Sequence, residues 1–64
     1  MLTDLQDLES ANILVIDDEE INLEIVGELL EQENYTNISY FSDPVKAVEY
    51  YQVTPPDIVL LDLN

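Results

Sequence analysis

The sequence predicts an α/β fold, a doubly wound parallel sheet built from strand, helix, strand, helix and strand. Two uninterrupted apolar runs, 13–16 and 58–61, lack a polar face and are typical of parallel strands that are covered on both sides. Two segments between them, 20–33 and 44–52, carry apolar residues at helical spacing. Short strands that alternate with helices of this length predict parallel βαβ units.

The first strand is predicted at 13–16 and the first helix at about 20–33. Acidic residues at 17–20 favour a helix start, because a helix N-terminus presents unpaired N–H groups and positive dipole charge. Gly27 costs this helix roughly 1 kcal/mol relative to alanine, and it either permits close packing on the sheet or has no structural role. One buried apolar stripe is expected on the helix, formed by Ile21, Ile25, Val26, Leu29 and Leu30.

The rest of the sequence predicts an edge strand, a second helix and a final buried strand. Asn34 can adopt the left-handed conformation that ends a helix, and the mixed pattern of 38–41 is typical of an edge strand. Ser-Asp-Pro at 42–44 predicts a helix start, because a capping side chain precedes proline at the first helical position. Asp57 is interpreted as a strand-entry residue. The second helix is expected to extend to about Gln52 with three side chains facing inward, Val45, Val48 and Tyr51.

Right-handed crossovers between parallel strands predict the strand order 2-1-3, with one helix on each face of the sheet. The first and third strands are then neighbours at the switch point of the topology, where open α/β sheets bind their ligands. Asp17, Asp18 and Asp62 would converge there. Simpler interpretations stay open. Asp17 would then only cap the following helix, and Asp18 would only be a solvated surface residue.

Three converging carboxylates favour a bound divalent cation. Two unit charges about 4 Å apart repel by about 4 kcal/mol at an effective dielectric constant of about 20. The only basic side chain, Lys46, lies on the second predicted helix and is poorly placed to neutralise them. Mg²⁺ prefers oxygen ligands, commonly takes one or two carboxylates and keeps waters that a phosphate can replace. The sequence therefore predicts a magnesium site.

Composition excludes several classes of function. The 64 residues include 15 acidic side chains and carry a net charge of −14, which disfavours direct binding to nucleic acid or to anionic membranes. The absence of cysteine and histidine excludes zinc sites with nitrogen or sulfur ligands, thiol nucleophiles and imidazole catalysis. No apolar run approaches the roughly 18 residues of a membrane span, and a cysteine-free chain fits a reducing cytoplasm. We therefore expect a soluble, cytoplasmic protein.

The sequence resembles the receiver domain of two-component response regulators over 12–64. The matching motifs are the first strand with its paired acids at 13–19, the Asp-Pro helix start followed by Lys-Ala-Val at 46–48, and the segment 56–64, which ends in Asp-x-Asn. The resemblance implies a flavodoxin-like fold truncated after its third strand, so that 12–64 would be the N-terminal half of a receiver. Residues 1–11 would form a leader, either frayed or folded as a short amphipathic helix.

The resemblance also implies a phosphoacceptor. Asp62 would take a phosphoryl group from the phosphohistidine of a sensor histidine kinase or of a phosphotransfer protein. Mg²⁺ would be bound by Asp18 and Asp62 through carboxylates, by Asn64 through its backbone carbonyl and by Asp17 through water. Such a domain is regulatory rather than an enzyme, and it acts at most on its own phosphorylation.

A complete receiver is expected to continue beyond the third strand, with a Ser/Thr and a Lys that contact the phosphoryl group. We therefore expect weak phosphoryl transfer by this chain alone, and a missing C-terminal half or output domain among its partners. The unpaired apolar edge of the last strand predicts self-association, complementation by a partner or partial disorder.

Two other functions stay open from the sequence. A non-catalytic interaction module would bind a partner through the exposed sheet edge, independently of Asp62 and of metal. A phosphohydrolase of the haloacid-dehalogenase type also ends an apolar strand in Asp-x-Asp. Here the third position is Asn64, and the pair Asp17 and Asp18 would be unexplained.

Overall fold

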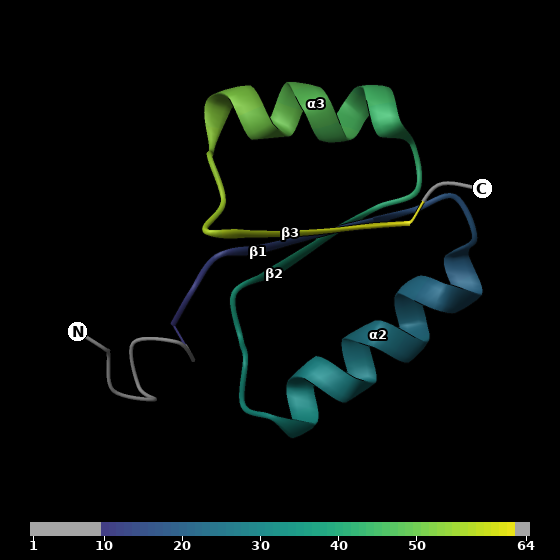
Figure 1. The fold of residues 1–64 in the computed structure, drawn as a ribbon, viewed down its shortest axis with the longest axis vertical. Coiled ribbons are helices and arrows are strands. Elements are labelled where there is room, and N and C mark those ends of the chain that lie inside the picture. The colour runs from purple at the N-terminus through teal and green to yellow at the C-terminus, as the bar shows by residue number, and fades with distance from the viewer. Residues whose placement is uncertain (1–9, 63–64) are drawn as a thin grey trace.

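The computed structural model describes residues 10–62, which form a three-stranded sheet with a helix on each face (Figure 1). In chain order the elements are β1 (Ile13–Asp17), α2 (Glu20–Gln32), β2 (Ile38–Phe41), α3 (Pro44–Val53) and β3 (Ile58–Asp62). The strands are parallel in the order β2-β1-β3, which confirms the predicted flavodoxin-like topology. Residues 1–9 of the leader predicted at 1–11 lie outside the described residues.

The centre of the sheet is β1, and all five of its residues are buried. Parallel pairing aligns Ile13 with Ile38 on one side and with Ile58 on the other. Its side chains Leu14 and Ile16 form the core together with Ala47 of α3, which is fully buried. An apolar run without a polar face is what a strand covered on both faces requires, and for β1 this prediction is confirmed.

The prediction that the third strand is buried on both faces is wrong. All five residues of β3 are exposed, and Leu61 keeps 61% of its surface accessible. Within residues 10–62, both helices pack on β1 and β2 and neither packs on β3. The apolar run correctly predicted the strand. Burial depends on what covers a strand, and the described elements leave β3 uncovered.

The predictions of which side chains on each helix face the sheet are also partly wrong. On α2, Ile21, Ile25 and Leu29 are 50–59% exposed, whereas the residues turned toward the sheet are Leu23, Val26, Gly27 and Leu30. On α3 the inward residues are Ala47 and Tyr50, and the exposed ones are Val45, Val48 and Tyr51. Each helix has more apolar positions than one face of β1 and β2 can cover. On each helix, the face that packs on the sheet is the one with a small residue, because a small residue lets the helix approach the sheet closely.

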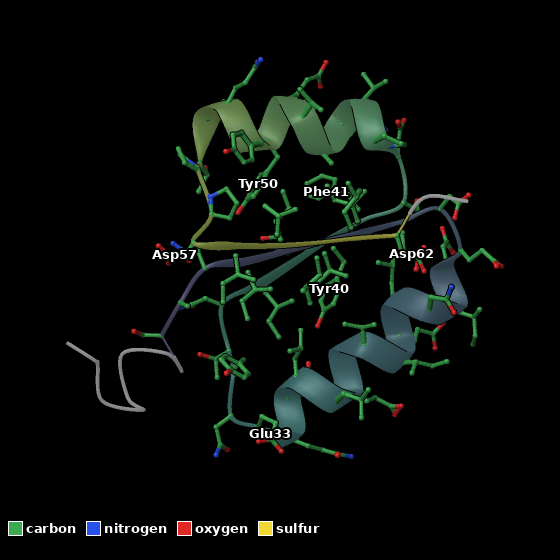
Figure 2. All side chains as sticks on the ribbon, in the orientation of Figure 1. Glu33, Tyr40, Phe41, Tyr50, Asp57 and Asp62 are labelled. Carbon is green, nitrogen blue, oxygen red and sulfur yellow. The ribbon has the colours of Figure 1, made fainter. Side chains whose placement is uncertain are left out.

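Gly27 shows how close this approach is. A Cβ atom at this position would lie 2.7 Å from the hydroxyl oxygen of Tyr40 and 3.1 Å from two ring carbons. Tyr40 projects from β2 toward α2 (Figure 2), so its ring lies against the helix where a side chain would otherwise stand. Of the two alternatives for Gly27, the structure supports close packing.

The helix on the other face is held by Tyr50. Its ring packs against Phe41 of β2 with centroids 5.1 Å apart, and its hydroxyl forms a 2.9 Å hydrogen bond with the Ser39 hydroxyl.

The predicted start of α3 is confirmed, since the Asp43 carboxylate accepts a hydrogen bond from the Val45 N–H at 2.9 Å and Pro44 is the first helical residue. Asn34 ends the turn after α2 in the left-handed region, with φ of 72°, as predicted.

Candidate functional site

The carboxyl ends of β1 and β3 meet at one edge of the sheet. In the parallel register, Asp17 is the direct partner of Asp62. Neighbouring strands lie about 4.8 Å apart, so the two aspartates leave the sheet side by side. Asp62 lies beside the loop that joins β1 to α2 (Figure 2).

The two paired aspartates differ in environment. Asp17 is buried, with 5% of its surface exposed, and its Oδ1 accepts a hydrogen bond from the Glu19 N–H at 2.9 Å. This bond holds the loop that carries Asp18 and leads into α2. Asp62 is exposed at the end of its strand. One carboxylate is therefore fixed in the fold, and the other is accessible to solvent.

Two other predicted ligands lie differently. Asp18 is exposed and follows Asp17 directly in the loop. Asn64 lies outside the described residues. Within residues 10–62, no group of three or more acidic side chains is arranged so as to enclose a metal ion. The structure thus brings Asp17 and Asp62 together, and this carboxylate set suits Mg²⁺, which commonly binds one or two carboxylates and completes its shell with water.

A hollow of about 480 Å³ lies beside these aspartates, between α2 and the uncovered face of β3. Asp17, Asp62 and Asn22 contribute its polar wall, and Val26 and Leu60 are among its apolar residues. The site prediction did not include Asn22. The signal for it is its spacing, because Asn22 and the half-buried Val26 are four residues apart and share one face of α2.

The register that aligns Asp17 with Asp62 is fixed at the opposite end of β3. The Asn12 carbonyl accepts hydrogen bonds from the N–H groups of Asp57 and Ile58 at 2.8 and 3.2 Å. In return, the Asp57 carboxylate accepts one from the Asn12 N–H at 2.8 Å. Asp57 is therefore the strand-entry residue that the sequence predicted.

Comparison with known families agrees with this arrangement. A family model described as the response regulator receiver domain matches residues 13–64, which include all five elements and the paired aspartates. The chain belongs to this receiver family. Receiver domains are regulatory domains of two-component signalling, and the chain is accordingly a regulatory signalling domain.

One curated relative of this receiver is the transcriptional regulatory protein YvrH of Bacillus subtilis (strain 168). The two are 30% identical over 56 residues, which cover 88% of this chain and 24% of the relative. The chain thus spans about a quarter of the length of the relative it matches. No solved structure gives a significant match. In the part of the chain that the structure describes, neither helix is long and apolar enough to cross a membrane.

Proposed function

We propose that this receiver is a phosphoacceptor and that Asp62 accepts the phosphoryl group. The observation that carries the proposal is the register of the sheet, which sets an exposed Asp62 beside a buried, hydrogen-bonded Asp17. The donor would be the phosphohistidine of a sensor histidine kinase or of a phosphotransfer protein, in the cytoplasm. An output domain or further receiver segment would read the modification.

The reaction is a displacement at phosphorus. A carboxylate oxygen of Asp62 forms the new P–O bond while the P–N bond to the donor imidazole breaks, and the imidazole leaves with the electron pair and takes up a proton. The product is an acyl phosphate on Asp62. Phosphoryl transfer depends mainly on positioning and on neutralising charge, so a pre-positioned strand end is a suitable nucleophile.

The chain's own residues would hold the cation that this chemistry needs. We assign Mg²⁺ ligation to the carboxylates of Asp18 and Asp62 and to the backbone carbonyl of Asn64, with Asp17 acting through water. When bound, the ion neutralises the oxygens of the transferred phosphoryl group. The Asp17 bond to the Glu19 N–H fixes the loop that carries Asp18.

The test uses a small phosphoramidate donor, which has the same P–N bond as phosphohistidine. The chain is incubated with phosphoramidate and Mg²⁺, and intact-mass spectrometry measures the gain of one phosphoryl group. Slow uptake is expected in the wild type, and the same uptake in Glu49→Gln, which removes an exposed carboxylate of α3. Asp62→Asn should abolish it. Equal uptake by Asp62→Asn, or no uptake by any form, would contradict the assignment.

A second function is favoured by the exposed face and edge of β3. Every residue of β3 is exposed, and among the described strands only β1 pairs with it. Such an apolar edge is a template for another chain, so we propose that it also supports self-association or docking on a partner. Sedimentation of Leu61→Lys tests this. The substitution should shift an associating wild type toward monomer, whereas binding through β3 should survive Asp62→Asn and removal of Mg²⁺.

A further inference from the structure

The other edge of the sheet, at β2, also lacks a described strand partner. The Asn37 carbonyl accepts a hydrogen bond from the Ile13 N–H at 2.8 Å and so points toward β1. Backbone groups of successive strand residues point alternately to the two sides, so those of Ile38 and Tyr40 point away from β1. They offer donors and acceptors to an added strand.

A trough runs beside this edge, on the side of the sheet covered by α2. It consists of two hollows of about 620 and 330 Å³ that share Glu31 and Tyr40. The first extends along α2 to Glu20 and the second extends to Ile38 of β2. Its floor includes Gly27, where the missing side chain leaves the Tyr40 ring against the helix.

The wall of the trough is strongly acidic. Four glutamates of α2 line it, Glu20, Glu24, Glu28 and Glu31, and none of the described residues that line the two hollows is basic. Lys46, the sole basic residue, belongs to α3 on the opposite face of the sheet. Partial burial raises the pKa of the Tyr40 hydroxyl, and the negative charge of Glu31, one of the glutamates of this wall, raises it further.

The spacing of the glutamates matches an extended chain. Residues four apart on a helix are about 6 Å apart along its axis, and side chains on one face of a strand repeat about every 6.7 Å. The stretch from Glu20 to Glu31 spans about 16 Å, which is the length of about five extended residues. Alternate side chains of a strand added at β2 would therefore face successive glutamates.

Other occupants fit this trough poorly. A second copy of the chain paired edge to edge at β2 would bring its own four glutamates against these four. Residues 1–9 contain Asp4, Asp7 and Glu9 and no basic residue, so they carry charge of the same sign. Nucleic acid and anionic membrane are repelled for the same reason.

We propose that the β2 edge and the glutamate-lined trough bind an extended, cationic peptide segment of a partner protein, with Lys or Arg at alternate positions. The segment adds to β2 through backbone hydrogen bonds, which is a known mode of peptide recognition. Its basic side chains face the glutamates of α2, and its other side chains face away from the trough. This surface is distinct from Asp62 and from the β3 edge.

The experiment measures binding of a fluorescein-labelled peptide of alternating lysine and valine to the full chain by fluorescence anisotropy, at low salt. Two peptides serve as controls, one with the same composition but its lysines in a single block, and one with alternate backbone nitrogens methylated. We expect the alternating peptide to bind about tenfold more tightly than either control, because only it offers both the spacing and the N–H donors. Equal binding of the three peptides would overturn the proposal.

Matched charge reversals locate the site. Glu24→Lys lies in the trough, and Glu49→Lys makes the same change at an exposed position of α3 on the other face. Glu24→Lys should weaken binding about tenfold, and Glu49→Lys less than about twofold. Equal weakening would mean a general charge effect and would overturn the site. Circular dichroism checks that both variants fold, and the methylated peptide tests the same edge on the unaltered chain.

Discussion

β1 and β3 carry nearly the same residues, four branched apolar side chains followed by aspartate, yet their environments are opposite. Every residue of β1 is buried and every residue of β3 is exposed. The difference comes from position. Among the described elements, β1 is the central strand under both helices, whereas β3 is paired on one side and no helix packs on it. The same local sequence therefore provides a core in one place and an exposed apolar strand that ends in an accessible carboxylate in the other.

The largest test of this contrast compares leucine truncations in the two strands. Leu14 is 1% exposed and Leu60 is 39% exposed. Leu14→Ala should lower the free energy of unfolding by about 2–5 kcal/mol, because it removes apolar contact and leaves a cavity. Leu60→Ala should cost about 1 kcal/mol or less. Urea denaturation followed by circular dichroism measures both, and similar losses would show that β3 is covered in solution.

A second test concerns the two aspartates that end these strands. Asp17→Asn keeps an oxygen that can accept the Glu19 N–H bond but removes a charge next to the proposed cation. If Asp17 acts through water, its loss should weaken Mg²⁺ binding about 10- to 100-fold. NMR shift titration with Mg²⁺ measures the affinity, with Glu49→Gln at an exposed position of α3 as the control. Unchanged affinity in Asp17→Asn would limit Asp17 to the loop.

Helix packing over β1 and β2 is tested at Gly27. Alanine should gain about 1 kcal/mol of helix propensity, but its Cβ would meet the Tyr40 ring. We therefore expect Gly27→Ala to stabilise the chain only in a Tyr40→Ser background, where the ring is gone. Thermal unfolding of the four combinations gives the coupling. An equal gain in both backgrounds would show that the Tyr40 ring moves aside freely.

The smallest expected effect is a pH dependence at Tyr40. Partial burial, with the charge of Glu31, raises the pKa of its hydroxyl above the ordinary value of 10.0. The folded state thus holds this proton more tightly than the unfolded state. Its contribution to stability is complete below about pH 10 and is lost as the pH rises through the raised pKa. Tyr40→Phe should reduce the loss of stability between neutral and alkaline pH, as measured by urea titration.

Sequence reasoning succeeded where the signal is local. Element order, the Asp43 cap, the left-handed Asn34 and the strand order all follow from short patterns and from the handedness of crossovers. It also aligned Asp17 with Asp62, because both end apolar strands that the topology makes neighbours.

Sequence reasoning failed where burial depends on distant elements. Val48 and Ile25 have the apolar character of core residues, but both are exposed. The helix face that packs on the sheet is instead the one that contains Ala47 on α3 and Gly27 on α2. A small residue gives no hydrophobic signal, although it decides how closely a helix can approach. The exposure of β3 could not be predicted either, because the apolar character of a strand does not show whether another element covers it.

The hydrogen bonds between Asp57 and Asn12 have a consequence for how the proposed nucleophile, Asp62, is placed. They fix the start of β3, and Asp62 follows at the far end of the strand, about 16 Å away. Successive side chains of a strand point to opposite faces. Inserting or deleting one residue between Asp57 and Asp62 would turn the carboxylate away from α2 and the Asp17 loop, even with every bond at Asp57 intact. The number of residues in β3 thus sets the face on which the phosphoryl group would be received.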